Sequence, residues 1–464
     1  MTIQRGAIVL GFTGSIGSGC TYISKTISDI SSHYKYFKLS NIIRESLKEK
    51  GNTTPTVEDL QIEGNELRNY HGNEVLVAMT INQLNSSTKN YTHLIIDGIK
   101  NDHEVNYLKQ FPNFYLFSVN ADRDIRKERV VGLEEGKHFS SPEEFIKADV
   151  RDEKENSING QQVKKCNELS DIVIVNEENI TSTSTKRKKE YVNKIISKYV
   201  DLIENHTSGK SMHENFPSVD ELCMTIAYAL SKKSSCLKRK VGAVIIEEDN
   251  KLPEEKERIE KEGRAIRIPN IVATGYNEVP MGTHKCIFNP EQQKCYRDHL
   301  QEEHARTMKF CASCGEKIGD IVISCPKCHT SYDHFVNFCT KCQTEIKYSY
   351  KCPNCDSSVF EEHLPGSKKT PGKLLDLCKA LHGEEMAILQ LTKRSTLPES
   401  ILILYVTTQP CNLCANKIAT AGIKKVVYSE PYTMKESAEI LDNGGVALER
   451  FQGVKSSAYF KLYN

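Results

Sequence analysis

The sequence lacks the features that would direct it to a membrane, and it carries almost no net charge. None of the apolar runs among its 464 residues reaches the roughly eighteen residues that a membrane-spanning helix needs. The short apolar stretch at the N-terminus lacks the length and cleavage pattern of a signal peptide, so a buried strand explains it better. Lysine and arginine number 62 against 61 aspartates and glutamates, and this balance gives no overall attraction to nucleic acids or anionic lipids. We therefore expect a cytoplasmic protein that makes no membrane contact.

Cysteine, by contrast, is abundant. The chain has 17 cysteines, and ten of them lie in five Cys-x-x-Cys pairs. In a sequence without a secretion signal, this spacing indicates metal binding before it indicates disulfide bonds.

Hydrophobic patterning predicts two α/β units. In residues 1–180, continuous apolar runs alternate with amphipathic, charge-rich stretches, which is typical of parallel strands and helices in a doubly wound sheet. These runs are residues 7–12, 93–99, 114–120 and 171–176. The second unit, residues 216–464, is predicted to be an α/β/α domain. Its strand-like runs are residues 241–246, 271–276, 401–407 and 425–430.

Two segments interrupt this pattern. Residues 181–215 turn polar and include a basic run at 186–189, which predicts a linker followed by a connecting helix. A solvated helix start explains the basic run better than contact with nucleic acid does. Residues 284–373 are dense in cysteine and lie between the second and third strands of the C-terminal unit, where they predict a separate metal-bound module.

The clearest chemical pattern is His382-x-Glu384 followed by Pro410-Cys411-x-x-Cys414. One imidazole and two thiolates make a three-ligand zinc site with an open position, where the pKa of a bound water falls to about 7. Glu384, two residues from a ligand, is placed to move that water's proton. Both cysteines fall on one side of a helix start, which also favours thiolates. This is the pattern of zinc-dependent nucleobase deaminases, and a structural knuckle with an unrelated histidine explains it less well.

Residues 216–460 resemble the deoxycytidylate deaminase branch of the cytidine deaminase superfamily. Five segments carry the likeness in the family's order: KRKVGAVI, ATGYNEVPMG, HGEEMAI, TTQPCNLCANKI and AGIKKVVYSE. The family usually has alanine where Gly383 stands and asparagine where Met386 stands. The resemblance implies that Asn277 holds the sugar or base edge of a deoxycytidine nucleotide, and that the loop through Pro280 helps to place its phosphates. Asn277 also fits a plain turn residue.

Four Cys-x-x-Cys knuckles follow one another in residues 306–360. Ten, ten and nine residues separate them, and two knuckles complete one tetrahedral Cys₄ site. The pattern predicts two structural zinc ions and resembles a double zinc ribbon, which would depend on metal to fold. Its role stays open between a scaffold or lid and a docking surface. The predicted ligands are Cys311, Cys314, Cys325, Cys328, Cys339, Cys342, Cys352 and Cys355.

A further zinc site is predicted from cysteines outside these knuckles. Deoxycytidylate deaminases often carry an extra structural zinc near the segments that hold Cys236, Cys286 and Cys295. The resemblance therefore implies a site that uses some of these thiols, with His284 or His304 as a further ligand. The remaining cysteines outside pairs fit small core residues better. They are Cys166, Cys223 and Cys378.

Near the N-terminus, a glycine-rich loop follows the first strand and opens a helix. The backbone N–H groups of such a loop cradle phosphates, but Cys20 stands where the pattern G-x-x-x-x-G-K-[ST] has lysine. Thr21 can still bind Mg²⁺, and Asp97 ends a strand where an acidic partner of that metal would lie. The predicted contacts are Gly14, Ser15, Ile16, Gly17, Ser18, Gly19, Cys20, Thr21 and Asp97.

This segment resembles nucleoside-monophosphate kinases and dephospho-coenzyme-A kinases, which share the phosphate loop. Loss of the lysine removes a charge that stabilises the transferring phosphoryl group. We therefore expect the loop to bind a purine nucleotide or another phosphate ligand with weak or absent kinase activity. A plain structural glycine turn is the alternative.

The order of the units resembles bacterial anti-phage deoxycytidine nucleotide deaminases over nearly the whole chain. That resemblance implies conversion of dCTP and dCMP to dUTP and dUMP, a regulatory N-terminal domain, homo-oligomers and, in some members, restraint by an RNA. Two other functions stay open. A housekeeping deoxycytidylate deaminase for thymidylate synthesis would not need residues 1–215. A nucleic-acid deaminase would bind through the ribbons, although the neutral net charge argues against it.

Overall fold

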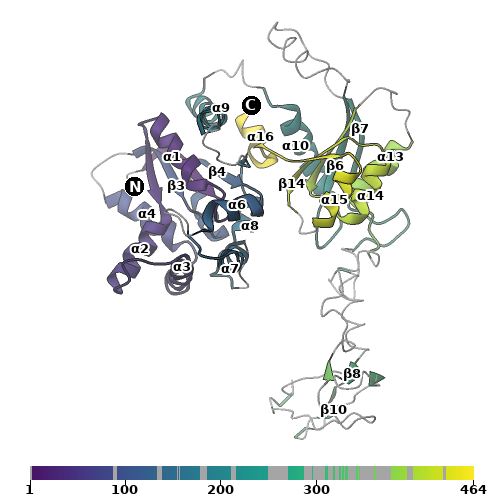
Figure 1. The fold of residues 1–464 in the computed structure, drawn as a ribbon, viewed down its shortest axis with the longest axis horizontal. Coiled ribbons are helices and arrows are strands. Elements are labelled where there is room, and N and C mark those ends of the chain that lie inside the picture. Colours follow the sequence, from purple (N-terminus) through teal and green to yellow (C-terminus); the bar gives the residue numbers. More distant parts are fainter. Residues whose placement is uncertain are drawn as a thin grey trace.

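The protein folds into two α/β lobes, each built around its own main sheet (Figure 1), which confirms the predicted mixed α/β class. This computed structural model describes residues 3–86, 91–132, 138–177 apart from 154 and 156, 185–210, 216–248, 270–286, 378–393, 401–431 and 435–463, and scattered residues between 287 and 377. Within that part of the chain, no helix combines the length and apolarity needed to cross a membrane.

The N-terminal lobe holds a six-stranded sheet. In their order across the sheet, its strands are β16 (Gly453–Val454), β5 (Ile172–Val175), β4 (Asn113–Asn120), β1 (Ile3–Thr13), β3 (Tyr91–Asp97) and β2 (Tyr34–Lys38). β1 to β5 run parallel, as the alternation of strands and helices predicts. Alternate residues of β1 enter two separate cores, with Leu10 and Phe12 on one face and Ala7 and Val9 on the other.

Helices cover both faces of this sheet. α1 (Cys20–Ile30), α9 (Thr185–Ser208) and α16 (Ser456–Leu462) pack on one face, and α2 (Leu39–Glu49), α4 (Val75–Ser86), α5 (Asp102–Leu108) and α8 (Val163–Glu168) contribute to the other. The lobe also contains α3 (Val57–His71), α6 (Arg123–Val130) and α7 (Pro142–Glu153). The helix expected as a connector is α9, and it buries Ile196 and Ile203 in the core of this lobe.

The C-terminal lobe holds a five-stranded sheet. Its strands, in order, are β15 (Ala447–Arg450), β14 (Lys425–Glu430), β13 (Ile401–Thr408), β6 (Gly242–Glu248) and β7 (Asn270–Tyr276). α13 (Gly383–Leu391), α14 (Asn412–Thr420) and α15 (Lys435–Asn443) pack on one face, and α10 (Val219–Ser231) packs on the other. β13 and β14 run parallel, so their carboxyl ends meet at the same edge of the sheet.

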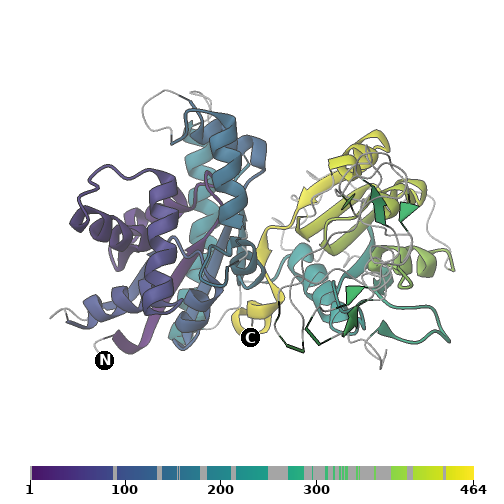
Figure 2. The same cartoon turned by 90° about the horizontal axis from the view of Figure 1, so that it is seen from below.

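The end of the chain returns to the first lobe and joins the two. β16 pairs antiparallel with β5, so the C-terminal residues complete the N-terminal sheet (Figures 1 and 2). Glu221, buried at the start of α10, accepts hydrogen bonds from the Val454 N–H at 2.9 Å and the Tyr463 hydroxyl at 3.0 Å. The Ser218 N–H also donates to this carboxylate, which closes a capping box on α10. The junction between the two lobes therefore consists of the β16–β5 strand pairing and of hydrogen bonds to the buried carboxylate of Glu221.

Within the predicted ribbon segment, the described residues form short strands and two turns. The thiols of Cys328 and Cys342 contact the hydroxyls of Thr330 and Thr344, two residues further on, at 3.1 and 3.2 Å. The side chains of the other six predicted ligands, and His304, lie outside the described residues, so the ribbon stays a prediction. The strands are β8 (Lys309–Cys311), paired with β9 (Lys317–Ile318) and β12 (Phe360–Glu361), and β10 (Ile323–Ser324), paired with β11 (Ser331–Tyr332).

Candidate active site

Two helix starts meet beside the C-terminal sheet. His382 is the N-cap of α13, and Cys411, which follows β13, is the N-cap of α14. Both have extended backbone conformations, and neither side chain caps its own helix. The imidazole and the thiol are therefore available as ligands.

The three predicted metal ligands come together. The ligand atoms of His382, Cys411 and Cys414 all lie within 4.8 Å of one another, and each sulfur is 3.4 Å from Nδ1 of the histidine. This donor set of one imidazole and two thiols fits a zinc site with three protein ligands. No other group of three His, Cys, Asp or Glu side chains gathers this closely among the residues that the structure describes.

The predicted acid lies in the first turn of α13, beside this group. Glu384 is only 3% exposed, and burial raises the pKa of its carboxyl to about 7. A carboxyl with a pKa near neutrality can both accept and donate a proton under physiological conditions. Next to it, the hydrogen bond from Cys414 lowers the pKa of Cys411 to about 4, so this thiol is readily ionised as a metal ligand must be.

Asn277, predicted to contact substrate, holds the start of α13 in place. Its Oδ1 accepts a hydrogen bond from the Gly383 N–H at 2.7 Å, and its Nδ2 donates to the Arg239 carbonyl at 3.1 Å. The residue is 6% exposed and lines the cavity described below. Nδ2 carries a second N–H, so contact with a nucleotide stays a prediction. Pro280 is exposed and is not among the described residues that line this cavity.

Two contacts that the sequence did not predict involve the segments that carry the predicted ligands, around α13 and α14. The hydroxyl of Ser437, buried on α15, donates to the Pro410 carbonyl at 2.7 Å, just before the first cysteine ligand. Lys417 of α14 forms an ion pair with Glu385 of α13. The buried hydrogen bond of Ser437 fixes the start of α14, whereas the partly exposed ion pair contributes little.

The start of α13 also lies unusually close to β7, at Gly275. A Cβ atom at this position would stand 2.1 Å from the Gly383 carbonyl oxygen and 2.6 Å from the Ala387 nitrogen. Only glycine permits this approach, which sets the depth at which His382 and Glu384 enter the site.

Gly275→Ala is therefore expected to push α13 away from β7. We expect the free energy of unfolding to fall by about 1–3 kcal/mol, because the two atoms nearest to the methyl group belong to the backbone. Metal binding by the three predicted ligands should weaken with it. Denaturant unfolding and metal analysis measure the effect, with Gly6→Ala as the control, since a Cβ there meets nothing within 4 Å. Equal stability of the two variants would contradict the close-packing argument.

A cavity of about 390 Å³ opens over the ligand group. Its volume lies in the range of small-molecule sites. His382, Glu384 and Cys411 contribute to its wall, together with Asn277 and Arg239. The other lining residues are Cys236, Lys238, Val241, Cys295, Cys378, Ala380, Thr408 and Gln409.

The cysteines predicted for a further zinc gather near this cavity. Cys236, Cys295 and Cys378 line it, and after burial these three neighbouring thiols raise the pKa of Cys286. Cys378 was expected in a hydrophobic core, but it is half-buried and lines the cavity together with Cys236 and Cys295. Its spacing in the sequence did not indicate this position. Among the described residues, no three of these sulfurs lie as close together as the catalytic ligands do, so the site stays a prediction. The other two predicted core cysteines, Cys166 and Cys223, are buried.

The glycine-rich loop and Asp97 come together in the N-terminal lobe. Gly17 and Gly19 have φ values of 80° and 89°, which favour glycine. Asp97 accepts hydrogen bonds from the hydroxyl of Thr21 at 2.8 Å and the thiol of Cys20 at 3.3 Å. Threonine and aspartate thus lie side by side, as an Mg²⁺ pair requires, while phosphate binding stays a prediction.

Side chains that the sequence did not single out contact the same loop. Lys100 Nζ lies 2.9 Å from the Gly14 carbonyl oxygen and 2.9 Å from the buried carboxylate of Asp152. That carboxylate also accepts from the Ile16 N–H at 3.2 Å. Lys100 therefore places a cation at the loop although the usual lysine position holds cysteine.

Residues 217–430 match the family model described as the cytidine and deoxycytidylate deaminase zinc-binding region. This part of the chain, a little under half of its length, is therefore similar to cytidine/deoxycytidylate deaminases. His382, Glu384, Cys411 and Cys414 all fall inside the matched range, and the deaminase part of the predicted resemblance is confirmed.

Three curated relatives show how the likeness is distributed. The deoxycytidylate deaminase of Schizosaccharomyces pombe is 25% identical over 52% of this chain and 47% of its own length, so this chain spans about half of that relative. The deoxycytidylate deaminase of Enterobacteria phage T4 is 27% identical over 48% of this chain and 84% of its own length. A UPF0200 protein of Methanococcus maripaludis is 28% identical over 37% of this chain and 88% of its own length.

Proposed function

We propose that this chain is a zinc-dependent hydrolase that deaminates deoxycytidine nucleotides. The observation that carries the proposal is the buried carboxyl of Glu384 in one cavity with His382 and Cys411, which form a close group with Cys414. A match of this region to the cytidine and deoxycytidylate deaminase model supports the choice of cytosine as the base.

The residues divide the chemistry between them. His382, Cys411 and Cys414 would hold a zinc ion, which when bound lowers the pKa of a water and so supplies a nucleophile near neutral pH. Glu384 would take one proton from the water as its oxygen adds at C4, and give it to the ring nitrogen. It would then take the second proton from the added hydroxyl and give it to the amino group, which leaves as ammonia. Asn277 acts as a positioning residue through the Gly383 N–H.

Ammonia release from dCMP, dCTP and single-stranded DNA, measured side by side, tests the substrate class. We expect release from deoxycytidine nucleotides and none from the polynucleotide, because the cavity is of small-molecule size and the chain has a formal net charge of only +1. Activity on DNA alone would contradict the proposal and favour the nucleic-acid deaminase.

We infer anti-phage defence as the biological role, in which loss of dCTP stalls phage replication. Support comes from the sequence resemblance and from the joining of the glycine-loop lobe to the deaminase lobe through β16. A housekeeping role in thymidylate synthesis uses the same site, and the relatives that are deoxycytidylate deaminases favour it. Expression of the wild type and Glu384→Ala in phage-challenged bacteria separates the two, since only the defence role predicts catalysis-dependent protection. Homo-oligomers and restraint by an RNA stay predictions from the resemblance.

The N-terminal loop is proposed to bind a purine nucleotide or another phosphate ligand with Mg²⁺. Thr21→Val removes the hydroxyl that contacts Asp97, and we expect Mg²⁺-dependent binding of ATP and GTP by the full chain to weaken on the order of tenfold. Thr26→Val is the matched control, because its hydroxyl bonds the Tyr22 carbonyl within the same helix. Equal nucleotide affinity of both variants, measured by calorimetry, would count against the loop as the binding site.

Structural zinc is proposed for the cysteine knuckles. Two knuckles for each Cys₄ site give two ions in addition to the catalytic one. Cys236, Cys286, Cys295 and Cys378 would add a further ion. Metal analysis of the purified protein should therefore find at least three zinc ions per chain, and a single ion would rule out the ribbons.

A further inference from the structure

A second cavity, of about 480 Å³, lies between the two lobes. One wall is α8 of the N-terminal lobe, and the opposite wall consists of the loop before β6 and the ends of β13 and β14. The lining residues are Gln162, Lys164, Lys165, Glu168, Lys238, Arg239, Lys240, Thr408, Glu430 and Pro431.

This interlobe cavity adjoins the catalytic cavity. Lys238, Arg239 and Thr408 line both of them. Thr408 ends β13, three residues before Cys411, and the Arg239 carbonyl accepts the hydrogen bond from Asn277. The two cavities are therefore neighbours that share part of their lining.

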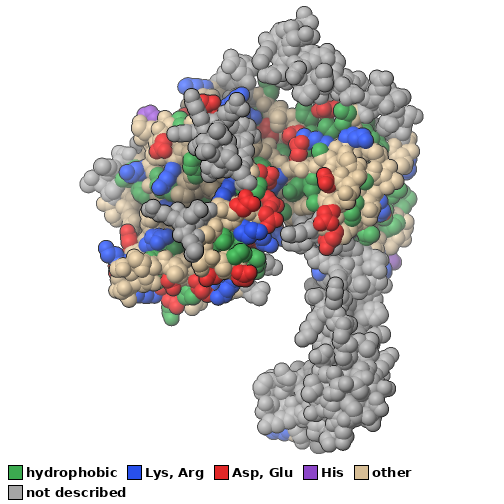
Figure 3. Space-filling model, in the orientation of Figure 1, with side chains coloured by type: hydrophobic (Ala, Val, Ile, Leu, Met, Phe, Trp, Pro, Cys, Tyr) green, Lys and Arg blue, Asp and Glu red, His purple; other side chains and the backbone are tan. Residues whose placement is uncertain are grey.

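The lining of the interlobe cavity is strongly cationic. It contains four lysines and one arginine against two glutamates, Glu168 and Glu430, and one of the lysines, Lys165, also lies 3.6 Å from Asp102. Glu430 is already engaged by the hydroxyl of Tyr228 at 2.8 Å and by Lys455 at 3.2 Å. Burial and the nearby Glu430 raise the pKa of Glu168. Elsewhere both signs are interspersed over the face in Figure 3, in keeping with the net charge of +1. The excess of positive charge is thus local.

Buried contacts hold the two walls together. Lys455 is 4% exposed, and its Nζ donates to the carbonyls of Asn167 at 3.1 Å and Glu168 at 3.0 Å, at the end of α8. The same Nζ donates to Glu430 at the end of β14. One lysine therefore ties the α8 wall to the deaminase wall and fixes Lys164 and Lys165 relative to the catalytic cavity.

We propose that the interlobe cavity binds the polyphosphate tail of a nucleotide whose base is deaminated in the adjoining catalytic cavity. This inference rests on the proposed deaminase function. Phosphate oxygens carry several negative charges, and clustered lysine and arginine side chains bind them through charge-assisted hydrogen bonds. The phosphate nearest the sugar meets Lys238 and Arg239, and the terminal phosphates meet Lys164, Lys165 and Lys240. The N-terminal lobe is then part of the substrate site and selects a triphosphate over a monophosphate.

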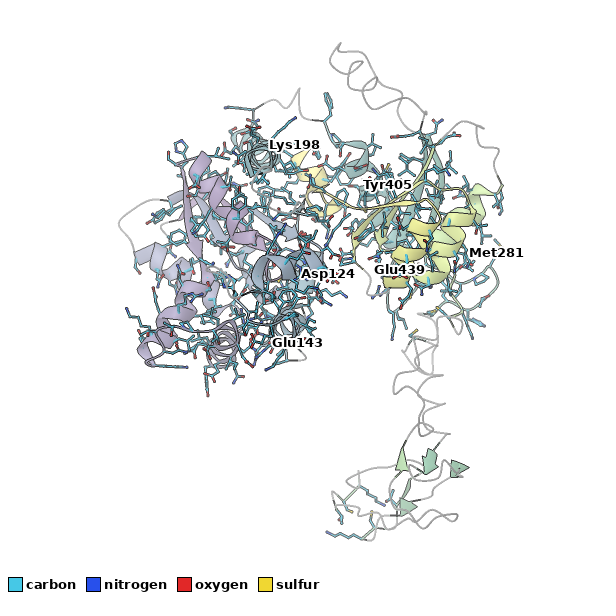
Figure 4. The ribbon with its side chains drawn as sticks, viewed as in Figure 1. Asp124, Glu143, Lys198, Met281, Tyr405 and Glu439 are labelled. Carbon is cyan, nitrogen blue, oxygen red and sulfur yellow. The ribbon has the colours of Figure 1, made fainter. Side chains whose placement is uncertain are left out.

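The double variant Lys164→Gln/Lys165→Gln tests this assignment. We expect kcat/KM for dCTP to fall at least about tenfold, because two charge-assisted contacts to the terminal phosphates are lost. With dCMP, kcat/KM should stay within about twofold, since its single phosphate does not reach α8. The matched control is Lys194→Gln/Lys198→Gln, which removes the same charge from exposed positions of α9, where Figure 4 labels Lys198. An equal fall for both nucleotides, or no fall for dCTP, would overturn the proposal.

Inorganic tripolyphosphate gives a second, activity-independent readout. It should bind the full-length wild type in calorimetry, compete with dCTP, and bind Lys164→Gln/Lys165→Gln at least about tenfold more weakly. Two results would overturn the assignment of this cavity to the triphosphate tail of the substrate. One is stimulation of dCMP deamination by tripolyphosphate, and the other is equal tripolyphosphate affinity of the wild type and the double variant. If the wild type deaminates no deoxycytidine nucleotide, the proposed function fails, while loss of tripolyphosphate binding in the variant still locates a polyphosphate site.

Discussion

Glu384→Gln is expected to lower kcat for deoxycytidine nucleotide deamination by about 10²–10⁴-fold, which is the usual contribution of general acid–base catalysis. The amide keeps the size of the carboxyl in a site where the residue is buried. It cannot carry a proton from the attacking water to the ring nitrogen and the leaving amine. Zinc content should be unchanged, because Glu384 is not among the three clustered ligands. Steady-state ammonia release and metal analysis of the same preparation measure both quantities.

The adjacent residue provides a closely matched control. Glu385 lies on the same helix and pairs with Lys417 at a partly exposed position. Surface ion pairs of this kind contribute about 0–1 kcal/mol, so Glu385→Gln should leave the deamination rate close to that of the wild type. Equal rates for Glu384→Gln and Glu385→Gln would remove Glu384 from the mechanism.

Cys414→Ser is expected to release the catalytic zinc and to bring deamination below detection. The sulfur of Cys414 is fully buried at the centre of the ligand group, 3.4 Å from Nδ1 of His382. A serine hydroxyl stays protonated near neutral pH and is a poor zinc ligand, whereas a thiolate binds zinc strongly. Metal analysis should therefore find one zinc ion fewer per chain than in the wild type.

Cys223→Ser separates this effect from the general cost of placing a hydroxyl in a core. Cys223 is equally a buried cysteine, but it packs from α10 into a hydrophobic cluster and joins no metal-ligating group among the described residues. Its variant should keep the full zinc content and measurable deamination, even if it unfolds at a lower temperature. A zinc content in Cys414→Ser equal to that of the wild type would contradict the assignment of this ligand.

The candidate site was largely predictable because its ligands come in short, regular spacings. Cys411 and Cys414 lie one helical turn apart, and Glu384 follows His382 at a fixed offset, so local geometry nearly determines how they point. The residues that position them could not be predicted in this way. Asn277 reaches Gly383 across 106 residues, and that contact exists only after β7 and α13 have packed.

The strands of both sheets were predicted where they are long and continuously apolar. β16 has only two residues, Gly453 and Val454, and carries no periodic pattern. Its pairing with β5 in the N-terminal sheet therefore could not be predicted from the sequence. A connecting helix was expected in residues 181–215 from their polar composition and basic run, but composition does not show which face of the helix is buried. It does not identify the sheet against which Ile196 and Ile203 pack.

By itself, the sequence determined the mixed α/β class and indicated the candidate ligands His382, Cys411 and Cys414 and the candidate acid Glu384, because these signals come from short motifs. Only the tertiary structure decided that α8 faces the catalytic lobe and that Lys164 and Lys165 share a cavity with the residues around β6. Contacts of this kind join segments far apart in the chain, and they form only when two separately folded lobes dock through β16 and Lys455.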